Sequence, residues 1–223
     1  MKSIRITNTK LRTPLILELF KGTGSVGRVA EKRGYNVISV DIEEKFKPDI
    51  HSDILKLDYK ALPTPNFIWA SVPCNTYSWL ICSGKSPARD CNTHKAITDV
   101  GRLGDRILNK TLEIIKYFEG KNPNLKWCIE NPRGMMRLQP QMKKIDRATT
   151  SYCQYGDKRN KPTDFFNNFD LQLKPLCVPS APHAKKDGMP IRHVLIKEIP
   201  LCERYKIPPK LIATIFDQAF SSF

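Results

Sequence analysis

The sequence has 223 residues, 40% of them hydrophobic, which is enough to build the core of one sizeable domain. Its formal net charge is +15, and over residues 133–161 eight Lys and Arg residues accompany two acidic ones. Such a stripe suits a nucleic-acid backbone or is a solvated basic face without a partner. There is no apolar run of the roughly 18 residues that a membrane span needs and no secretory signal, so we expect no membrane association and a soluble, intracellular protein.

The first third of the chain alternates between strands and a helix. Residues 15–20 form an apolar run typical of a buried strand, and a glycine-rich turn and a helix to about Arg33 follow it. Residues 36–40 predict a second strand, which ends in Asp41.

The alternation continues to the end of the chain. Residues 67–71 predict a strand, residues 103–118 carry apolar side chains at helical spacing, and residues 127–129 predict a short strand. A late strand is expected at 193–196, and Pro208 with the next proline opens a C-terminal helix. This order predicts an α/β fold, a single domain over residues 1–223, with a mainly parallel sheet and helices on both faces.

The glycine-rich turn is the first candidate for ligand binding. Gly22, Gly24 and Gly27 match the spacing G-x-G-x-x-G between a strand and a helix, where glycine lets the backbone approach a ligand closely. Asp41 ends the next strand, where a carboxylate can accept hydrogen bonds from ribose hydroxyls. The pattern fits NAD, FAD or S-adenosylmethionine, or a tight turn without a ligand.

Further residues favour S-adenosylmethionine. Phe20 can cover an adenine, and Asp53 can accept from the adenine amino group. A dinucleotide would also need phosphate contacts at the helix N-terminus, which S-adenosylmethionine does not. The predicted cofactor-binding residues are Glu18, Phe20, Gly22, Gly24, Asp41, Asp53, Ile54 and Pro73.

Cys74 and Glu130 are the predicted catalytic pair. Cys74 follows Pro73 just beyond a strand end, and Glu130 begins Glu-Asn-Pro at another. Considered alone, a free cysteine is more often a small buried hydrophobic side chain, and Asn-Pro often only makes a turn. Together, a thiolate can add to carbon 6 of cytosine while a glutamate holds N3 and N4, which activates carbon 5 toward a methyl donor. The base must flip out of a duplex to reach both groups.

These segments resemble the DNA (cytosine-5) methyltransferase family. Residues 18–25 are similar to its cofactor loop, and Val72-Pro73-Cys74 to its Pro-Cys motif, with Val72 where proline is more usual. Glu130-Asn131-Pro132 is similar to its Glu-Asn motif. Blocks at 152–156 and 161–164 resemble compact phage- and virus-type members, and the resemblance covers the chain from about residue 15 to about residue 216.

The resemblance implies a Rossmann-like methyltransferase fold and transfer of a methyl group from S-adenosylmethionine to C5 of a flipped cytosine in DNA, through a Cys74 adduct at C6. Only about residues 167–206 remain for a recognition region, so it is very small, and a separate partner could supply specificity to a monomer or homodimer. For a viral protein the location would be host cytoplasm or nucleus. The implied nucleic-acid contacts are Asn131, Arg133, Arg137, Gln154, Lys158, Arg159 and Lys161.

Several alternatives remain open at this point. The substrate could be a tRNA-type RNA instead of DNA, the chain could be an inactive DNA-binding module, and a nicotinamide-dependent enzyme is a further possibility. No metal site is predicted, because Cys82, Cys91 and His94 lack the spacing of common zinc modules and a fourth ligand.

Overall fold

Seven strands form one mixed sheet in the computed structural model, which describes residues 13–79, 87–178, 185–186, 189–190, 193–194 and 198–221. The strands are β1 (Leu15–Leu19), β2 (Asn36–Asp41), β3 (Ile50–His51), β4 (Phe67–Ala70), β5 (Lys126–Pro132), β6 (Arg147–Ser151) and β7 (Pro162–Asn167). A separate two-stranded ribbon pairs β8 (Lys185–Lys186) with β9 (Met189–Pro190).

The strand order of the large sheet is β3-β2-β1-β4-β5-β7-β6. The first five strands are parallel, whereas β7 runs antiparallel to both β5 and β6. The order 3-2-1-4-5 is that of a Rossmann-like doubly wound sheet. The predicted α/β fold class with a mainly parallel sheet is therefore confirmed.

Four α-helices lie among the described residues: α1 (Ser25–Lys32), α2 (Asp99–Lys121), α3 (Leu201–Arg204) and α4 (Pro209–Ala219). Short 3-10 turns are η1 (Glu44–Phe46), η2 (Tyr59–Ala61), η4 (Met135–Leu138) and η5 (Tyr152–Tyr155). Thr98 caps α2 by accepting from the Gly101 amide at 3.2 Å, and Pro209 occupies the first turn of α4.

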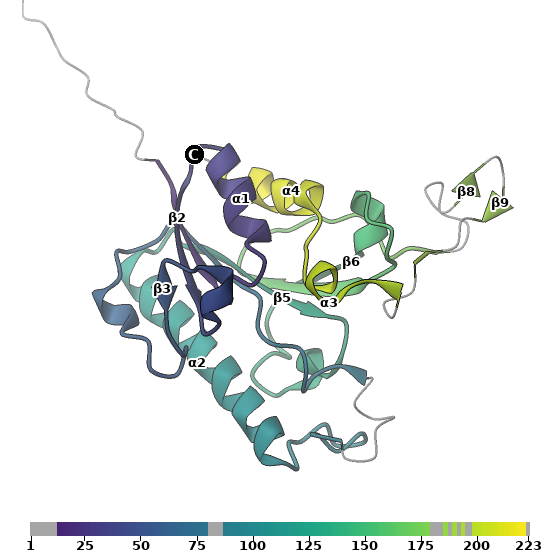
Figure 1. The fold of residues 1–223 in the computed structure, drawn as a ribbon. Helices are drawn as coiled ribbons and strands as arrows, with labels where there is room; N and C mark the ends of the chain where they lie inside the picture. Colours follow the sequence, from purple (N-terminus) through teal and green to yellow (C-terminus); the bar gives the residue numbers. More distant parts are fainter. Residues whose placement is uncertain are drawn as a thin grey trace, which may run out of the picture.

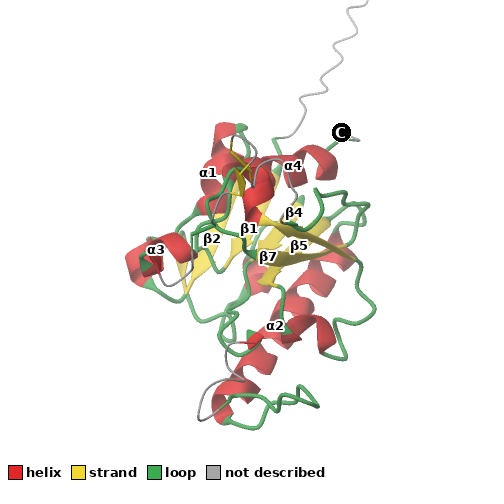
Figure 2. Ribbon diagram, turned by 90° about the vertical axis from the view of Figure 1, so that its right-hand side faces the viewer, coloured by secondary structure: helices red, strands yellow, loops and turns green. Residues whose placement is uncertain are grey.

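Each face of the sheet is covered by helices, because alternate residues of each strand point to opposite faces. Ile16 and Trp69 pack with α1 and α4 in one core, whereas Leu17 and Ile68 pack with α2 in the other. The two views show α1 and α4 on one side of the strands and α2 on the other (Figures 1 and 2). The predicted coverage of both faces is confirmed.

The main differences from the predicted elements lie in the second half of the chain. β5 extends through Glu130 to Pro132, so these residues belong to the strand itself. β6 and β7 were not predicted. The strand expected at 193–196 is wrong for His193 and Val194, which lie outside any strand, while 195–197 fall outside the described residues.

The described helices include none whose length and apolar character would suffice to cross a bilayer.

Candidate functional site

A cavity of about 620 Å³ opens at the carboxyl ends of β1, β4 and β5. Ligands of open α/β sheets bind at this edge. The cavity joins the glycine-rich loop after β1 to Cys74 and Glu130, which the sequence predicted to meet. Its lining is Glu18, Phe20, Lys21, Gly22, Thr23, Ser25, Val26, Glu43, Lys45, Phe46, Ser71, Val72, Pro73, Cys74, Glu130, Pro132, Lys161, Tyr205 and Ile207.

The loop between β1 and α1 has an unusual backbone. Gly24 has a φ of +67° and directly precedes α1, a left-handed conformation that glycine adopts without steric cost. Phe20 also has a positive φ, +61°, which is uncommon for a residue with a large side chain and is typical of ligand sites. This turn places Phe20 in the wall of the cavity and of a neighbouring slot.

Glu18 occupies the anion position at the N-terminus of α1. Its Oε2 accepts from the Gly27 amide at 3.1 Å, and the side chain is buried. Burial raises the pKa of Glu18 to about 7, against the lowering effect of that hydrogen bond. A pyrophosphate would meet a carboxylate where a dinucleotide site offers free amides. Glu18 thus occupies the amide that a pyrophosphate would use, which disfavours NAD and FAD, and above about pH 7 its carboxylate can face a cationic ligand such as S-adenosylmethionine.

An apolar slot of about 70 Å³ adjoins the cavity at Phe20 and Pro73. Its lining is Phe20, Val40, Asp41, Ile42, Ser52, Ile54, Pro73 and Ile107. Asp41 accepts from the amides of Gly22, at 2.7 Å, and Glu43, at 2.8 Å. Each carboxylate oxygen keeps a further lone pair, so Asp41 can also accept from ribose hydroxyls.

Asp53 and Ile54 lie differently from each other. Ile54 lines the slot, whereas Asp53 uses Oδ1 to accept from the Leu55 amide at 3.0 Å and does not line it. The apolar slot and Asp41 offer the contacts that an adenosine moiety would use, and Glu18 lines the adjoining cavity.

The loop that carries Cys74 is fixed from both sides. The Cys74 carbonyl accepts from the amides of Tyr77 and Ser78, at 3.0 and 3.1 Å. Asn131 donates from Nδ2 to the Val72 carbonyl at 2.8 Å, which ties the loop to β5. Gly134 allows the close approach, since a Cβ there would lie 2.3 Å from the Tyr77 carbonyl oxygen.

Glu130 forms a buried polar cluster with two residues that are distant in sequence. The Tyr152 hydroxyl donates to Glu130 Oε1 at 2.8 Å, and Lys161 Nζ lies 3.7 Å from the same oxygen. The Lys161 ammonium also lies 4.8 Å from the centre of the Tyr152 ring. Lys161 was predicted to contact phosphates; the structure places it, largely buried, in the cavity with Cys74.

The Cys74 thiol is poised between opposing effects. Its pKa is raised overall: burial raises it most, the Lys161 ammonium lowers it, and the charge of Glu130 raises it further. Lys161 thus favours the thiolate, which is the reactive form of a cysteine.

The other predicted nucleic-acid contacts divide into two groups. Arg133 and Lys158 are exposed, and Gln154 is half-buried. Arg137 forms a two-pronged ion pair with the buried Asp164, and Asn131 is itself buried.

Arg159 belongs with the inward-facing group. It pairs with Asp157 and donates to the carbonyls of Glu203, Arg204 and Lys206. The structure therefore gives Arg137, Arg159 and Asn131 internal partners, and their contact with a nucleic acid stays a prediction.

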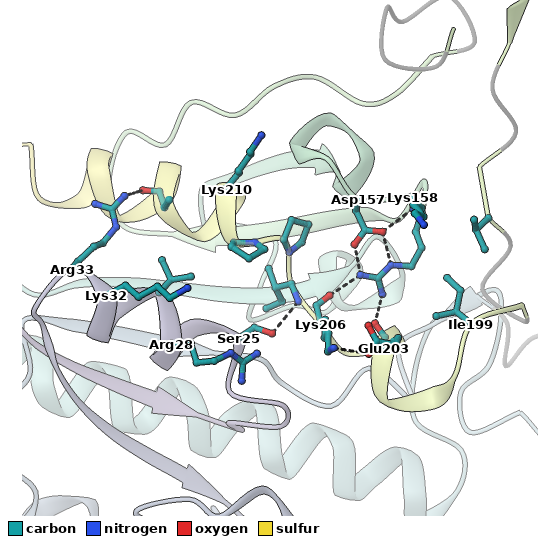
Figure 3. Close-up of a pocket in the computed structure, with 17 residues that line it drawn as sticks. Ser25, Arg28, Lys32, Arg33, Asp157, Lys158, Ile199, Glu203, Lys206 and Lys210 are labelled. Carbon is teal, nitrogen blue, oxygen red and sulfur yellow. Dashed lines mark hydrogen bonds and ion pairs between the residues drawn. The ribbon is translucent and has the colours of Figure 1, made fainter. Parts of the chain in front are cut away.

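A second cavity, of about 710 Å³, shares Ser25 and Ile207 with the first (Figure 3). Its walls come from α1, from the turn at Asp157–Arg159, and from the segment leading into α4. Lys32, Lys158 and Lys210 are exposed at its rim and form no ion pair among the described residues. Of these three lysines, only Lys158 was predicted from the sequence as a nucleic-acid contact.

No protein-family model matches the sequence, and no curated protein matches it. Solved structures with some likeness include Dnmt2 methyltransferase of S. pombe, with a TM-score of 0.46 and 12% identity, covering 73% of this chain and 52% of that one. For the methyltransferase EhMeth of Entamoeba histolytica the values are 0.44, 14%, 74% and 56%. For a mutant DNMT2 of Spodoptera frugiperda they are 0.45, 15%, 73% and 53%.

The chain thus spans about half the length of each of these proteins. All three TM-scores lie below 0.5, and the Rossmann-like fold is identified by the strand order of the sheet.

Replacement of Glu18 by glutamine should change how stability depends on pH. Glu18 is protonated in the folded protein up to about pH 7 but only to about 4.5 when unfolded. Its contribution to stability is present below 4.5 and is lost as pH rises through 7, a change of about 3 kcal/mol. In urea unfolding, the free energy of unfolding of Glu18→Gln minus that of the wild type should therefore rise by about 3 kcal/mol between pH 4.5 and pH 7.5. Glu31→Gln, on the exposed side of α1, is the control; a gap that does not vary with pH refutes the assignment.

Lys161 should set the pH at which Cys74 becomes reactive. Iodoacetamide alkylation of Cys74, followed by peptide mass spectrometry over a pH series, reports its thiolate. In Lys161→Met we expect the midpoint to move to higher pH because the compensating charge is gone. Lys161→Arg should keep the wild-type midpoint. An unchanged midpoint in Lys161→Met would show that the ammonium does not act on the thiol.

Proposed function

We propose that the protein is an S-adenosylmethionine-dependent cytosine-5 methyltransferase that acts on DNA. The observation that carries the proposal is one cavity lined by Cys74, Glu130 and Lys161 on one side and by Glu18 and the glycine-rich loop on the other. A nucleophile, a carboxylate for the base and a cation-accepting pocket are the groups that this reaction requires.

Each residue of the cavity has a distinct role in the proposed reaction. The Cys74 thiolate, favoured by Lys161, adds to C6 of the flipped cytosine. Glu130 shares a proton with N3 and accepts from the N4 amino group, so that electron density moves to C5. Tyr152 holds the Glu130 carboxylate in place. Once C5 carried the methyl group that bound S-adenosylmethionine would supply, a base or water would take the C5 proton as the Cys74–C6 bond breaks, and the proton shared with N3 would return to Glu130, which regenerates the enzyme.

Bound S-adenosylmethionine would supply an electrophilic methyl group. Asp41 would hold its ribose, Phe20 and Ile54 would enclose its adenine, and Glu18 would face its cationic end. Pro73 lines both the slot and the cavity, so it lies between the adenine site and Cys74.

The second cavity has a lining that is suited to binding a polyanionic substrate. It continues from the catalytic cavity at Ser25 and Ile207, and its floor includes the apolar Val29, Pro208 and Ala213. The lysines of its rim suit the phosphates of nucleotides that flank the flipped base, while the floor suits sugar and base surfaces. With so short a recognition region, these contacts position the strand without reading its sequence, and specificity is left to a separate partner.

Methyl transfer is tested directly with radiolabelled S-adenosylmethionine and cytosine-rich DNA, with 5-methylcytosine identified by mass spectrometry. We expect transfer by the wild type, none by Cys74→Ala, and retention by Cys128→Ala, whose sulfur is buried within β5 away from the cavity. DNA containing 5-fluorocytosine should form a covalent complex that requires Cys74. Transfer to tRNA alone would move the substrate to RNA; cofactor binding without any 5-methylcytosine would refute the activity.

The lysines of the second cavity should control the salt dependence of DNA binding. In the triple variant Lys32→Ala, Lys158→Ala and Lys210→Ala, the slope of log affinity against log salt should fall in magnitude by about 3, since each phosphate contact contributes about 0.9. S-adenosylmethionine binding should not change. Alanines at the exposed Lys56, Lys60 and Lys116 are the matched control. Equal slopes in the two triple variants would exclude this cavity from the DNA path.

A further inference from the structure

Two cysteines and a histidine converge outside the catalytic cavity. Cys153 lies in η5, Cys177 in the segment after β7, and His193 further along the chain. The Sγ atoms of the cysteines and a ring nitrogen of the histidine all lie within 4.8 Å of one another. Cys177 Sγ is 3.8 Å from His193 Nε2. Three segments that are separate in sequence thus bring three strong metal ligands to one point.

The spacing of these atoms is close to that of a metal site. With Zn–S bonds of about 2.3 Å and Zn–N bonds of about 2.0 Å, tetrahedral ligand atoms lie about 3.5–3.8 Å apart. Both cysteines are free thiols, so neither sulfur is used in a disulfide. Thiolate with imidazole is a donor set that selects zinc over magnesium or calcium.

We propose that Cys153, Cys177 and His193 bind a zinc ion. The three protein donors leave one tetrahedral position for a fourth ligand. Binding releases the protons of the two thiols to solvent and forms two Zn–S bonds and one Zn–N bond. The other candidates for such a site are weaker, since Cys91 is disulfide-bonded and Cys82 lies outside the described residues.

The zinc ion would fasten the small recognition segment to the catalytic body. Cys177 and His193 lie 16 positions apart in the sequence, and the ion would join them. The Cys177 amide already donates to Ser151 Oγ at 3.0 Å, next to Tyr152, which contacts Glu130. Small protein structures that cannot bury a sufficient core are commonly stabilised by a bound metal ion.

Metal content tests the site without any assay of methyl transfer. Full-length protein expressed in zinc-supplemented medium and desalted under reducing conditions should hold about one zinc per chain by mass spectrometry of the metal. Cys153→Ser, Cys177→Ser and His193→Asn should each lose it. Cys74→Ser and His51→Asn are matched controls that should keep it, because neither residue belongs to the cluster.

A measurement on the unmutated chain guards against variants that fail to fold. Cobalt added to metal-free wild type should give the strong visible bands of a tetrahedral ion and a thiolate charge-transfer band. Wild type without zinc and without these bands would overturn the proposal, as would zinc retained in all three variants or a Cys153–Cys177 disulfide in the zinc-supplemented protein. None of these results depends on the proposed methyl transfer, so the two proposals fail separately.

Discussion

The cavity at the carboxyl edge of the sheet depends on the partners that stabilise one buried carboxylate, that of Glu130. Glu130 is 6% exposed, and a charge so deeply buried is costly unless hydrogen bonds and an opposite charge accompany it. Tyr152 and Lys161 supply these, and they come from η5 and from the residue before β7. The position of β7 beside β5 is therefore tied to the chemistry, since only that pairing brings Lys161 to Glu130.

The same cluster links the two halves of the cavity. Lys161 acts on Glu130 and on Cys74, so one ammonium serves both the carboxylate and the thiol of the proposed reaction. Asn131, the next residue of β5, holds the loop before Cys74 through the Val72 carbonyl. β5 thus fixes both the orientation of its own carboxylate and the place of the thiol, while β1 and its loop provide the opposite wall.

The parts of the site that follow from local sequence patterns could be predicted, whereas those that depend on the pairing of distant strands could not. The apolar run before the glycines specifies β1 and the turn, and parallel strands place Cys74 and Glu130 at one edge, because their carboxyl ends coincide. β7 escaped prediction since its centre carries the buried polar residues Thr163 and Asp164 in place of an apolar alternation.

Once β7 was missed, Lys161 and Arg137 could be assigned only from their charge, as surface phosphate contacts. Their true partners, Glu130 and Asp164, become neighbours through strand pairing over long sequence separations. The convergence of Cys153, Cys177 and His193 escaped for the same reason, as no short spacing motif joins them.

The hydrogen bond between the Ile207 amide and Ser25 Oγ has a consequence for how the protein assembles. It joins residues 182 positions apart, and both residues line the wall between the two cavities. The glycine-rich loop and Cys74 leave the ribosome long before Tyr205 and Ile207 do. The cavity can therefore close only after nearly the whole described chain has been synthesised, and contacts of such long range form slowly. Until then the apolar surface of β1 and α1 that α4 later covers is open to solvent, and transiently exposed surface of this kind promotes aggregation during folding.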